Sequence, residues 1–292
     1  MPFSNASSRI RLFAASLFLT LPIVTARAQE EVAEPPRLAW QAGPLTAPIG
    51  SSLAEIELPE GYVFLGKEDT AKLLELMKNP VSGEELATLA PASDKASWLV
   101  FFEWDPSGWV DDSEKDDLDA DALLKSLQEG NRRGNEERKS RGWPTLEIVG
   151  WQEKPHYDEA TNNLTWAIDA KSEGHQVFNR MVKLLGRRGV MTVTIVSDPN
   201  ELADASAATD ALLTGYHFKT GSTYAEYLPG KDQIANYGLG ALVAGGVGAA
   251  ALKSGLLAKF WKYLVIGALG VAGGVKRLIT GRKHIADPPT TV

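Results

Sequence analysis

The sequence contains no cysteine, and that absence excludes several kinds of chemistry at once. Its 292 residues can form no disulfide bond, no thiolate zinc or iron–sulfur site and no thiol nucleophile. Histidine is scarce and widely spaced, so a three-histidine zinc site would require the fold to bring distant residues together. The four histidines are His156, His175, His217 and His284.

Motifs of nucleotide-binding and hydrolase sites are also missing. The chain has no G-x-S-x-G and no H-E-x-x-H sequence. Residues 61–67 match the spacing of a phosphate-binding loop, but Glu68 follows Lys67 where the motif needs Ser or Thr. The loop positions are, moreover, strand-forming apolar residues. We therefore expect no nucleotide site and no cofactor.

Charge is distributed unevenly along the chain. The net charge is −7, yet residues 1–29 carry +3 and residues 253–292 carry +6, which leaves −16 for residues 30–252. An acidic body repels phosphate backbones, so we expect no nucleic-acid partner. Basic ends beside apolar stretches are typical of membrane topology signals, and membrane lipid is the expected contact.

The N-terminus has the features of a secretory signal peptide. Arg9 and Arg11 precede a short apolar run at 12–21, and Ala26-Arg27-Ala28 is a small-x-small cleavage site ahead of Gln29. The apolar run reaches only about 15 Å as a helix, half of a bilayer core. We expect the mature chain to begin at Gln29, outside the cytoplasm.

Two apolar stretches near the C-terminus predict a membrane anchor. Residues 233–252 carry no charge and would span about 30 Å as a helix, whereas residues 260–275 are more apolar and span about 24 Å. Spaced small residues favour close helix packing in lipid. The residues assigned to that packing are Gly245, Gly248, Gly270 and Gly274.

The topology of this anchor has two alternatives. Lys253, Lys259 and Lys262 favour a cytoplasmic loop and hence a two-helix hairpin, whereas the basic residues after 275 favour a cytoplasmic tail and a single span. The paired small residues need a partner helix, so the hairpin is the preferred interpretation. A Gly/Ala-rich buried hairpin in a soluble protein is the remaining alternative.

The body between these ends predicts an α+β fold with a mainly antiparallel sheet and a few packed helices. Strand patterns separated by short turn signals are typical of a hairpin meander. The expected strands cover 54–58, 61–65, 98–104, 146–153, 164–170, 176–185 and 190–196, and the expected helices 70–79, 119–141 and 198–213.

These features divide the chain into six parts. The parts are a signal peptide (1–28), an extended lead-in (29–50), a soluble α+β domain (51–222), a linker (223–232), a membrane anchor (233–283) and a tail (284–292).

The body carries several spaced motifs, at residues 44–50, 58–65, 98–112, 119–124, 141–143, 150–151, 155–158, 164–167 and 185–190. Together they resemble one family of bacterial membrane-anchored proteins, domain of unknown function 2167. The resemblance covers nearly all of the chain after the signal peptide. It implies a secreted body with a C-terminal anchor, and no established activity.

An acidic segment is the first candidate site. Oxygen-rich clusters suit hard cations such as calcium, but the segment lacks the glycine of an EF-hand loop, where Ala122 stands. Gln128 occupies the position of the bidentate Glu. We therefore expect no metal, and instead a solvated loop in which Asp119 or Asp117 stabilises the start of the next helix. The weak metal candidates are Asp111, Asp112, Asp117, Asp119 and Asp121.

Aromatic residues suggest a second candidate. A groove lined by Trp109, Trp151 and Tyr157 and rimmed by Asp105 and Asp158 would suit a peptide or glycan. The same tryptophans are equally suited to packing in the core.

The sequence thus favours a non-catalytic protein of the bacterial inner membrane whose periplasmic domain binds lipid or a protein partner. The alternative is a hydrolase-like envelope enzyme that uses Glu103, Asp105 or Asp158 as general acid and base. A catalytic site should show converging carboxylates in a pocket, and a binding module should not.

Overall fold

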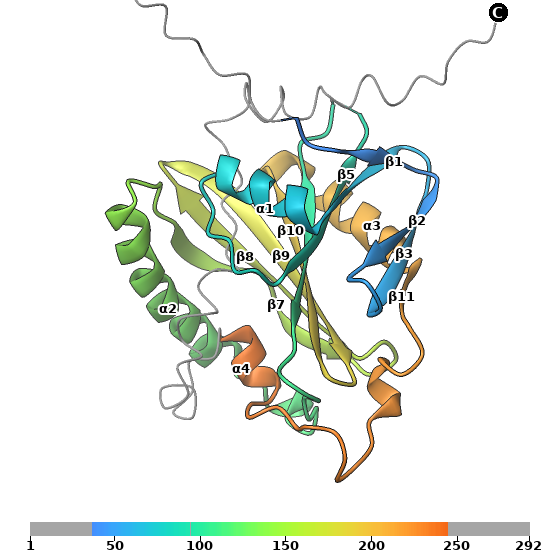
Figure 1. The fold of residues 1–292 in the computed structure, drawn as a ribbon. Coiled ribbons are helices and arrows are strands. Elements are labelled where there is room, and N and C mark those ends of the chain that lie inside the picture. Colours follow the sequence, from blue (N-terminus) through green and yellow to red (C-terminus); the bar gives the residue numbers. More distant parts are fainter. Residues whose placement is uncertain (1–36, 94, 245–292) are drawn as a thin grey trace, which may run out of the picture. The chain divides into compact units, whose positions relative to one another are not determined.

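The computed structural model describes residues 37–93 and 95–244, which form two antiparallel sheets and four α-helices (Figure 1). The large sheet has the order β1 (Gln41–Ala42), β4 (Tyr62–Gly66), β5 (Glu85–Pro91), β6 (Leu99–Asp105), β10 (Gly189–Ser197), β9 (His175–Gly186), β8 (Asn163–Ser172) and β7 (Glu147–Asp158). The small sheet has the order β11 (Tyr216–Phe218), β3 (Ala54–Leu58) and β2 (Leu45–Ile49). The helices are α1 (Lys67–Leu76), α2 (Ala120–Ser140), α3 (Leu202–Leu213) and α4 (Leu239–Val243).

The large sheet is covered on both faces. The small sheet and α3 pack on one face, and α1, α2 and α4 pack on the other. All nine residues of β10 are buried, and its side chains alternate between the two cores. Met191 and Val193 belong to the core beneath the small sheet, whereas Val190 and Val196 contact the helical side. Alternation with two apolar faces is what a strand between two layers requires.

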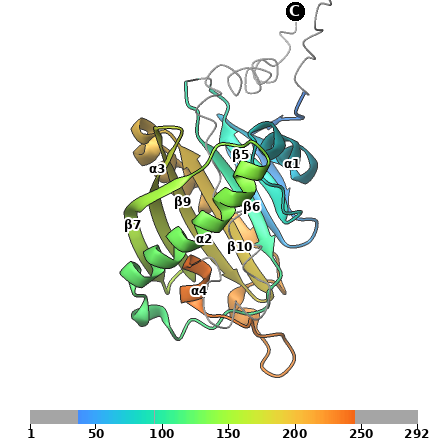
Figure 2. The ribbon, with the colours of Figure 1, turned by 90° about the vertical axis from the view of Figure 1, so that its left-hand side faces the viewer.

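Helix α2 lies across the strands at one end of the large sheet (Figure 2). Asn131 and Asn135 both donate side-chain hydrogen bonds of 2.6 Å to the carbonyl of Leu146, just before β7. At the other end of the helix, Arg138 donates to the Asn79 side chain at 3.1 Å, in the segment after α1. These contacts connect α2 to the residue before β7 and to the segment after α1.

The α+β class and the antiparallel meander that the sequence predicted are confirmed. Strands β7 to β10 are consecutive antiparallel neighbours, and β3, β4, β6, α2 and α3 lie close to their expected positions. Strands β1, β2, β5 and β11 were not expected, because the lead-in was assigned as extended and 85–91 and 216–218 were left unassigned.

Several expected boundaries were wrong, and two of the differences have a clear physical reason. Helix α1 begins at Lys67 instead of residue 70, because β4 continues directly into it and Glu68 and Asp69 suit the positive end of its dipole. Strand β7 continues through Pro155 to Asp158 instead of ending at the expected residue 153. Pro155 is tolerated since β7 is an edge strand, where one side of the backbone needs no ladder hydrogen bond.

The first part of the stretch assigned to the membrane packs on the domain. The Trp109 amide donates to the Gln233 carbonyl, and the Ala235 amide donates to the Trp109 carbonyl, each at 2.8 Å. Helix α4 follows and buries Leu239, Leu242 and Val243 in the core beneath α2. No helix in 37–93 or 95–244 is both long and apolar enough to cross a membrane. The positions Gly245, Gly248, Gly270 and Gly274 lie outside the described residues.

The turn between β9 and β10 gives a test of the central pairing. A Cβ atom added at Gly189 would lie 2.1 Å from the Asp105 carbonyl oxygen on β6. We expect Gly189→Ala to lower the free energy of unfolding by about 2–3 kcal/mol, because the backbone must move. Gly150→Ala is the control, with no atom within 4 Å and an expected change within about 0.5 kcal/mol. Equal denaturation midpoints for the two variants would contradict this account.

Candidate functional site

The aromatic residues of the expected groove are held in contacts within the chain. The Trp109 ring stacks on Tyr227 and Tyr224, with centroids 4.2 and 5.1 Å apart. The Trp151 indole donates a 2.9 Å hydrogen bond to the Ala120 carbonyl at the start of α2. The Tyr157 hydroxyl donates to Asp112 at 2.9 Å, and desolvation by burial raises its pKa. These three residues therefore fasten the loop before α2, and the chain after α3, to the sheet.

The two carboxylates of that groove lie at different places. Asp105 ends β6 and accepts a 2.7 Å hydrogen bond from the Tyr237 hydroxyl. Asp158 is exposed at the β7–β8 turn, where the Thr161 hydroxyl and the Ala160 amide donate to it and lower its pKa. The register places Asp158 four strands from β6, a separation of about 19 Å. These two carboxylates do not rim one groove.

The acidic segment is built from local turns. Asp111 accepts a 2.8 Å hydrogen bond from the Ser113 amide, which lowers its pKa. Asp119 is the N-cap of α2 and accepts from the amides of Asp121 and Ala122, each at 3.1 Å, as the sequence predicted. Asp117 lies in a short 3₁₀ helix between them. Within 37–93 and 95–244, no cluster of three His, Asp or Glu side chains is arranged to hold a metal ion.

A row of charged residues inside the core is the unexpected feature of the structure. The register aligns Glu85, Glu103, Thr192 and Lys183 across β5, β6, β10 and β9, on the face that carries α1 and α2. All four are at most 5% exposed. Lys183 donates to the Thr192 hydroxyl at 2.7 Å and its ammonium lies 5.9 Å from the centre of the Trp166 ring. Charged groups this deeply buried are costly unless they are paired.

Burial shifts the two central charges toward neutrality. Desolvation, reinforced by nearby Glu85, raises the pKa of Glu103, and desolvation lowers the pKa of Lys183 against the attraction of Glu103 and Asp105. Glu85 is held by the loop before it, since the Gly83 amide and the Ser82 hydroxyl each donate to it at 2.8 Å. Shifts of acidic and basic pKa values toward neutrality within one cluster are typical of functional sites, but they also occur in structural ion pairs.

Polar atoms in this row and elsewhere on the same face of the sheet have no hydrogen-bond partner among the residues that the structure describes. They are one carboxylate oxygen of Glu103, both amide atoms of Asn179, the Thr194 hydroxyl and the Trp166 indole nitrogen. Each such group costs about 1–3 kcal/mol when it is left unpaired. We call the row and these neighbours the polar core patch. The sequence analysis named Glu103 as a candidate but missed Lys183. The pattern that could have revealed Lys183 is a charged residue between the apolar Met181 and Leu185 on one face of a buried strand.

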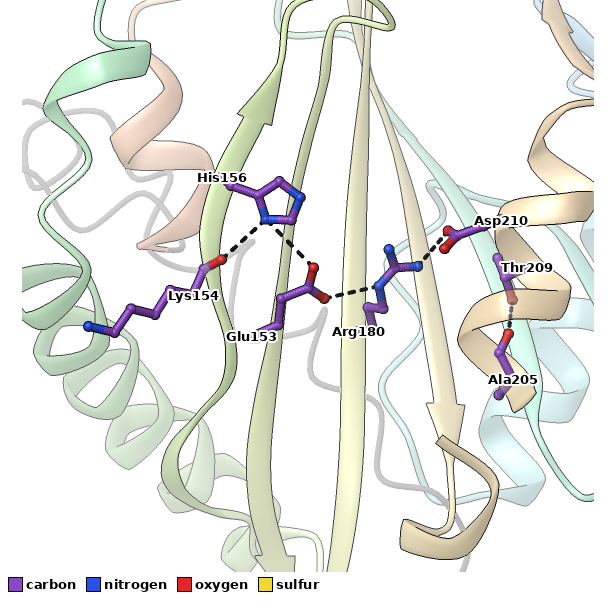
Figure 3. A network of polar contacts seen from close by, with 7 residues as sticks. All are labelled: Glu153, Lys154, His156, Arg180, Ala205, Thr209 and Asp210. Carbon is purple, nitrogen blue, oxygen red and sulfur yellow. Dashed lines mark hydrogen bonds and ion pairs between the residues drawn. The ribbon is translucent and has the colours of Figure 1, made fainter. Parts of the chain in front are cut away.

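A second polar network lies on the opposite face and joins the sheet to α3 (Figure 3). Arg180 on β9 contacts Glu153 of β7 at 3.2 Å and Asp210 of α3 at 2.7 Å. The His156 ring nitrogen lies 3.6 Å from Glu153 and 3.4 Å from the Lys154 carbonyl. Glu153 and Asp210 are 36% and 55% exposed, so this network stabilises the α3 contact only modestly.

Two cavities open between the large sheet and the layer that covers it on the α3 side. One, of about 570 Å³, lies between the small sheet and α3, and its single charged lining residue is Glu57. The other, of about 820 Å³, lies beside the β2–β3 turn, and its charged lining residues are Lys67 and Arg188. Both volumes fall in the range of small-molecule sites.

Comparison with known proteins agrees with the resemblance seen in the sequence. A family model described as a protein of unknown function (DUF2167) matches residues 41–275. The chain belongs to this family. No curated protein matches it. Among solved structures, the solution structure of cyanobacterial PsbP (CyanoP) from Synechocystis sp. PCC 6803 is similar with 10% identity and a TM-score of 0.35, over 65% of this chain and 96% of that one.

The N-cap of α2 gives a test of the acidic segment. We expect Asp119→Ala to lower the free energy of unfolding by about 1 kcal/mol, because two helix amides lose their acceptor. Asp116→Ala, which removes an exposed carboxylate from the same segment, should change it by less than about 0.5 kcal/mol. Urea denaturation measures both, and a wild-type chain stabilised by micromolar calcium would contradict the structural role.

The polar core patch predicts a pH dependence of stability. The pKa of Glu103 is about 8 in the fold against a usual 4.5. The contribution of this carboxyl group to the free energy of unfolding is therefore complete below pH 4.5 and is lost as the pH rises through 8. The pKa of Lys183 is about 8 in the fold against a usual 10.5. The burial of Lys183 therefore lowers the free energy of unfolding below pH 8, and this loss is recovered as the pH rises from 8 to 10.5. We expect Glu103→Gln to reduce the fall in melting temperature between pH 5 and 8 by at least about 3 °C.

Glu147→Gln is the matched control for that measurement, because Glu147 is exposed on β7. It should leave the pH dependence unchanged. If the curves of melting temperature against pH were parallel for wild type and Glu103→Gln, the pKa of the Glu103 carboxyl would be the same in the folded and unfolded chain, which would contradict the prediction.

Proposed function

We propose that the chain is a membrane-tethered binding domain of the bacterial envelope, without catalytic activity of its own. One observation carries the binding role. The linings of the two cavities contain a single carboxylate, Glu57, and no histidine, so neither holds the pair of carboxylates on which the hydrolase-like alternative depends. Each has the size and mixed lining of a ligand site.

The location rests on the ends of the chain. The cleavage site at 26–28 supports export of the domain, and the basic, apolar C-terminal region supports a tether in the inner membrane. The acidic body disfavours nucleic acid as a partner. Membrane lipid and a protein of the envelope are the partners that this location offers.

The packing of α4 bears on how the tether crosses the membrane. The hairpin preferred from the sequence needs residues 239–243 in lipid, yet these residues fill the core beneath α2. Residues 245–252 alone reach about 12 Å, too short to cross. A single span over 260–275, of about 24 Å, leaves the domain intact and puts Lys276, Arg277, Arg282 and Lys283 in the cytoplasm.

Only one pair of the candidate catalytic carboxylates lies close enough together to support the enzyme alternative. Asp158 is too far from Glu103 to share a reaction with it, whereas Glu103 and Asp105 are alternate residues of β6, about 7 Å apart along the strand. The pKa of Glu103 is raised, which suits a carboxyl group that acts as a general acid and so favours the enzyme alternative. The burial of Glu103 at 5% exposure disfavours it, because a substrate must reach the carboxyl.

A fusion experiment tests the tether. We expect a green fluorescent protein joined after Val292 to be fluorescent and to sediment with membranes, and an alkaline phosphatase at the same place to be inactive. Mass spectrometry of the purified chain should give Gln29 as its first residue.

The reverse pattern of fusion activities would restore the hairpin and require α4 to leave the domain. Recovery of the full chain in the aqueous fraction without detergent would contradict the membrane tether. An N-terminus at Met1 would contradict cleavage of the signal peptide and export.

A further inference from the structure

The larger cavity lies where the two sheets separate at one end. Its walls come from the β2–β3 turn, the junction of β4 and α1, the end of β6 and the β9–β10 turn. Four apolar side chains, Leu53, Phe64, Leu86 and Trp104, line it and also pack against the core beneath the small sheet. Trp104 is further held edge-on by Phe218, with ring centroids 5.9 Å apart. This wall is therefore part of the folded core and is already formed without a ligand.

The charged lining of this cavity has one sign. Lys67 and Arg188 line it together with Ser51, Ser52 and Ser222, and no carboxylate is among its lining residues. The contrast with the surrounding protein is large, because residues 30–252 carry a charge of −16. A site with two cations and no carboxylate is suited to an anion.

The donors of these two cations are available to a ligand. Lys67 is exposed and gives one hydrogen bond, of 2.9 Å, to the Gly83 carbonyl, which leaves two of its three donors. Arg188 is exposed at the tip of the β9–β10 turn. Over the described residues, neither side chain forms an ion pair with a carboxylate.

We propose that this cavity binds an organic anion that has an apolar part. The anionic group lies against Lys67 and Arg188, and the apolar part lies against Phe64, Leu86 and Trp104. The smaller cavity, whose only charge is Glu57, would not accept such a ligand. The proposal rests on the binding role proposed above and adds to it the chemical class of the ligand.

Isothermal titration calorimetry on the full mature chain in nanodiscs of neutral lipid tests the proposal. The probe is naphthalene-1-sulfonate, an aromatic anion, and naphthalene-1-sulfonamide is the same ring without the charge. We expect saturable binding of the sulfonate, at least tenfold weaker binding of the sulfonamide, and no detectable binding of methanesulfonate, which lacks the apolar part. Empty nanodiscs provide the blank.

Variants locate the site. Lys67→Gln combined with Arg188→Gln should weaken binding of the sulfonate at least tenfold, with an unchanged melting temperature because both side chains are exposed. The matched control removes two exposed cations of α2, Arg132→Gln with Lys139→Gln, and should leave binding unchanged.

Equal affinities for sulfonate and sulfonamide, equal losses in the two double variants, or no saturable binding would overturn the proposal. Nanodiscs that contain phosphatidylglycerol then distinguish the natural source: competition supports a lipid head group, and its absence supports a water-soluble anion. Membrane attachment is not measured here, so a negative result would leave the tether untouched.

Discussion

The burial of the large sheet on both faces is the constraint on which the rest of the structure depends. Strand β10 has a layer on each side and no exposed residue, so every side chain it carries must suit a core. This condition explains the run of Val, Ile, Met and Thr in the strand. It also explains why Gly189 must remain small, since the strand begins where the backbones of β6 and β10 approach each other closely.

The same constraint makes the polar core patch unusual. A sheet open to water on one face could place Glu103, Thr192 and Lys183 in solvent at little cost. Here α1, α2 and α4 cover that face, so the charges must be compensated inside the protein. Lys183 achieves this in part through Thr192 and the ring of Trp166, while Asn179 and Thr194 keep unpaired atoms within the described residues. The fold therefore carries a local cost at its centre that apolar residues would not impose.

The covering layers also explain why the concave sites lie where they do. The helical face is closed by the contacts of α2 with Leu146 and Asn79. The opposite face is covered by a sheet of only three strands and by α3. The two cavities occur at this smaller layer, where they are lined by side chains such as Trp104 and Leu58.

Local sequence patterns were sufficient to predict the meander of β7 to β10, helix α2 with Asp119 or Asp117 at its start, and the α+β class; the structure shows that Asp119 is the cap. These features depend on residues close together in the chain, where alternation, capping and turn signals act locally. Strand β5 escaped prediction because its residues, ELATLAP, are buried by α1 and β6 and show no alternation of their own.

The functional geometry was decided only by the tertiary structure. Sequence reasoning grouped Trp109, Trp151 and Tyr157 by residue type, yet their partners, such as Tyr227 and Ala120, come from distant segments. Glu103 and Lys183 are 80 positions apart and lie in one cross-strand row because β10 pairs with both of their strands. Lys67, at the start of α1, and Arg188, in the β9–β10 turn, are 121 positions apart and line one cavity. Composition and local pattern determine which elements form, but strand order and layer packing determine which side chains meet, because those contacts join residues that no local pattern relates.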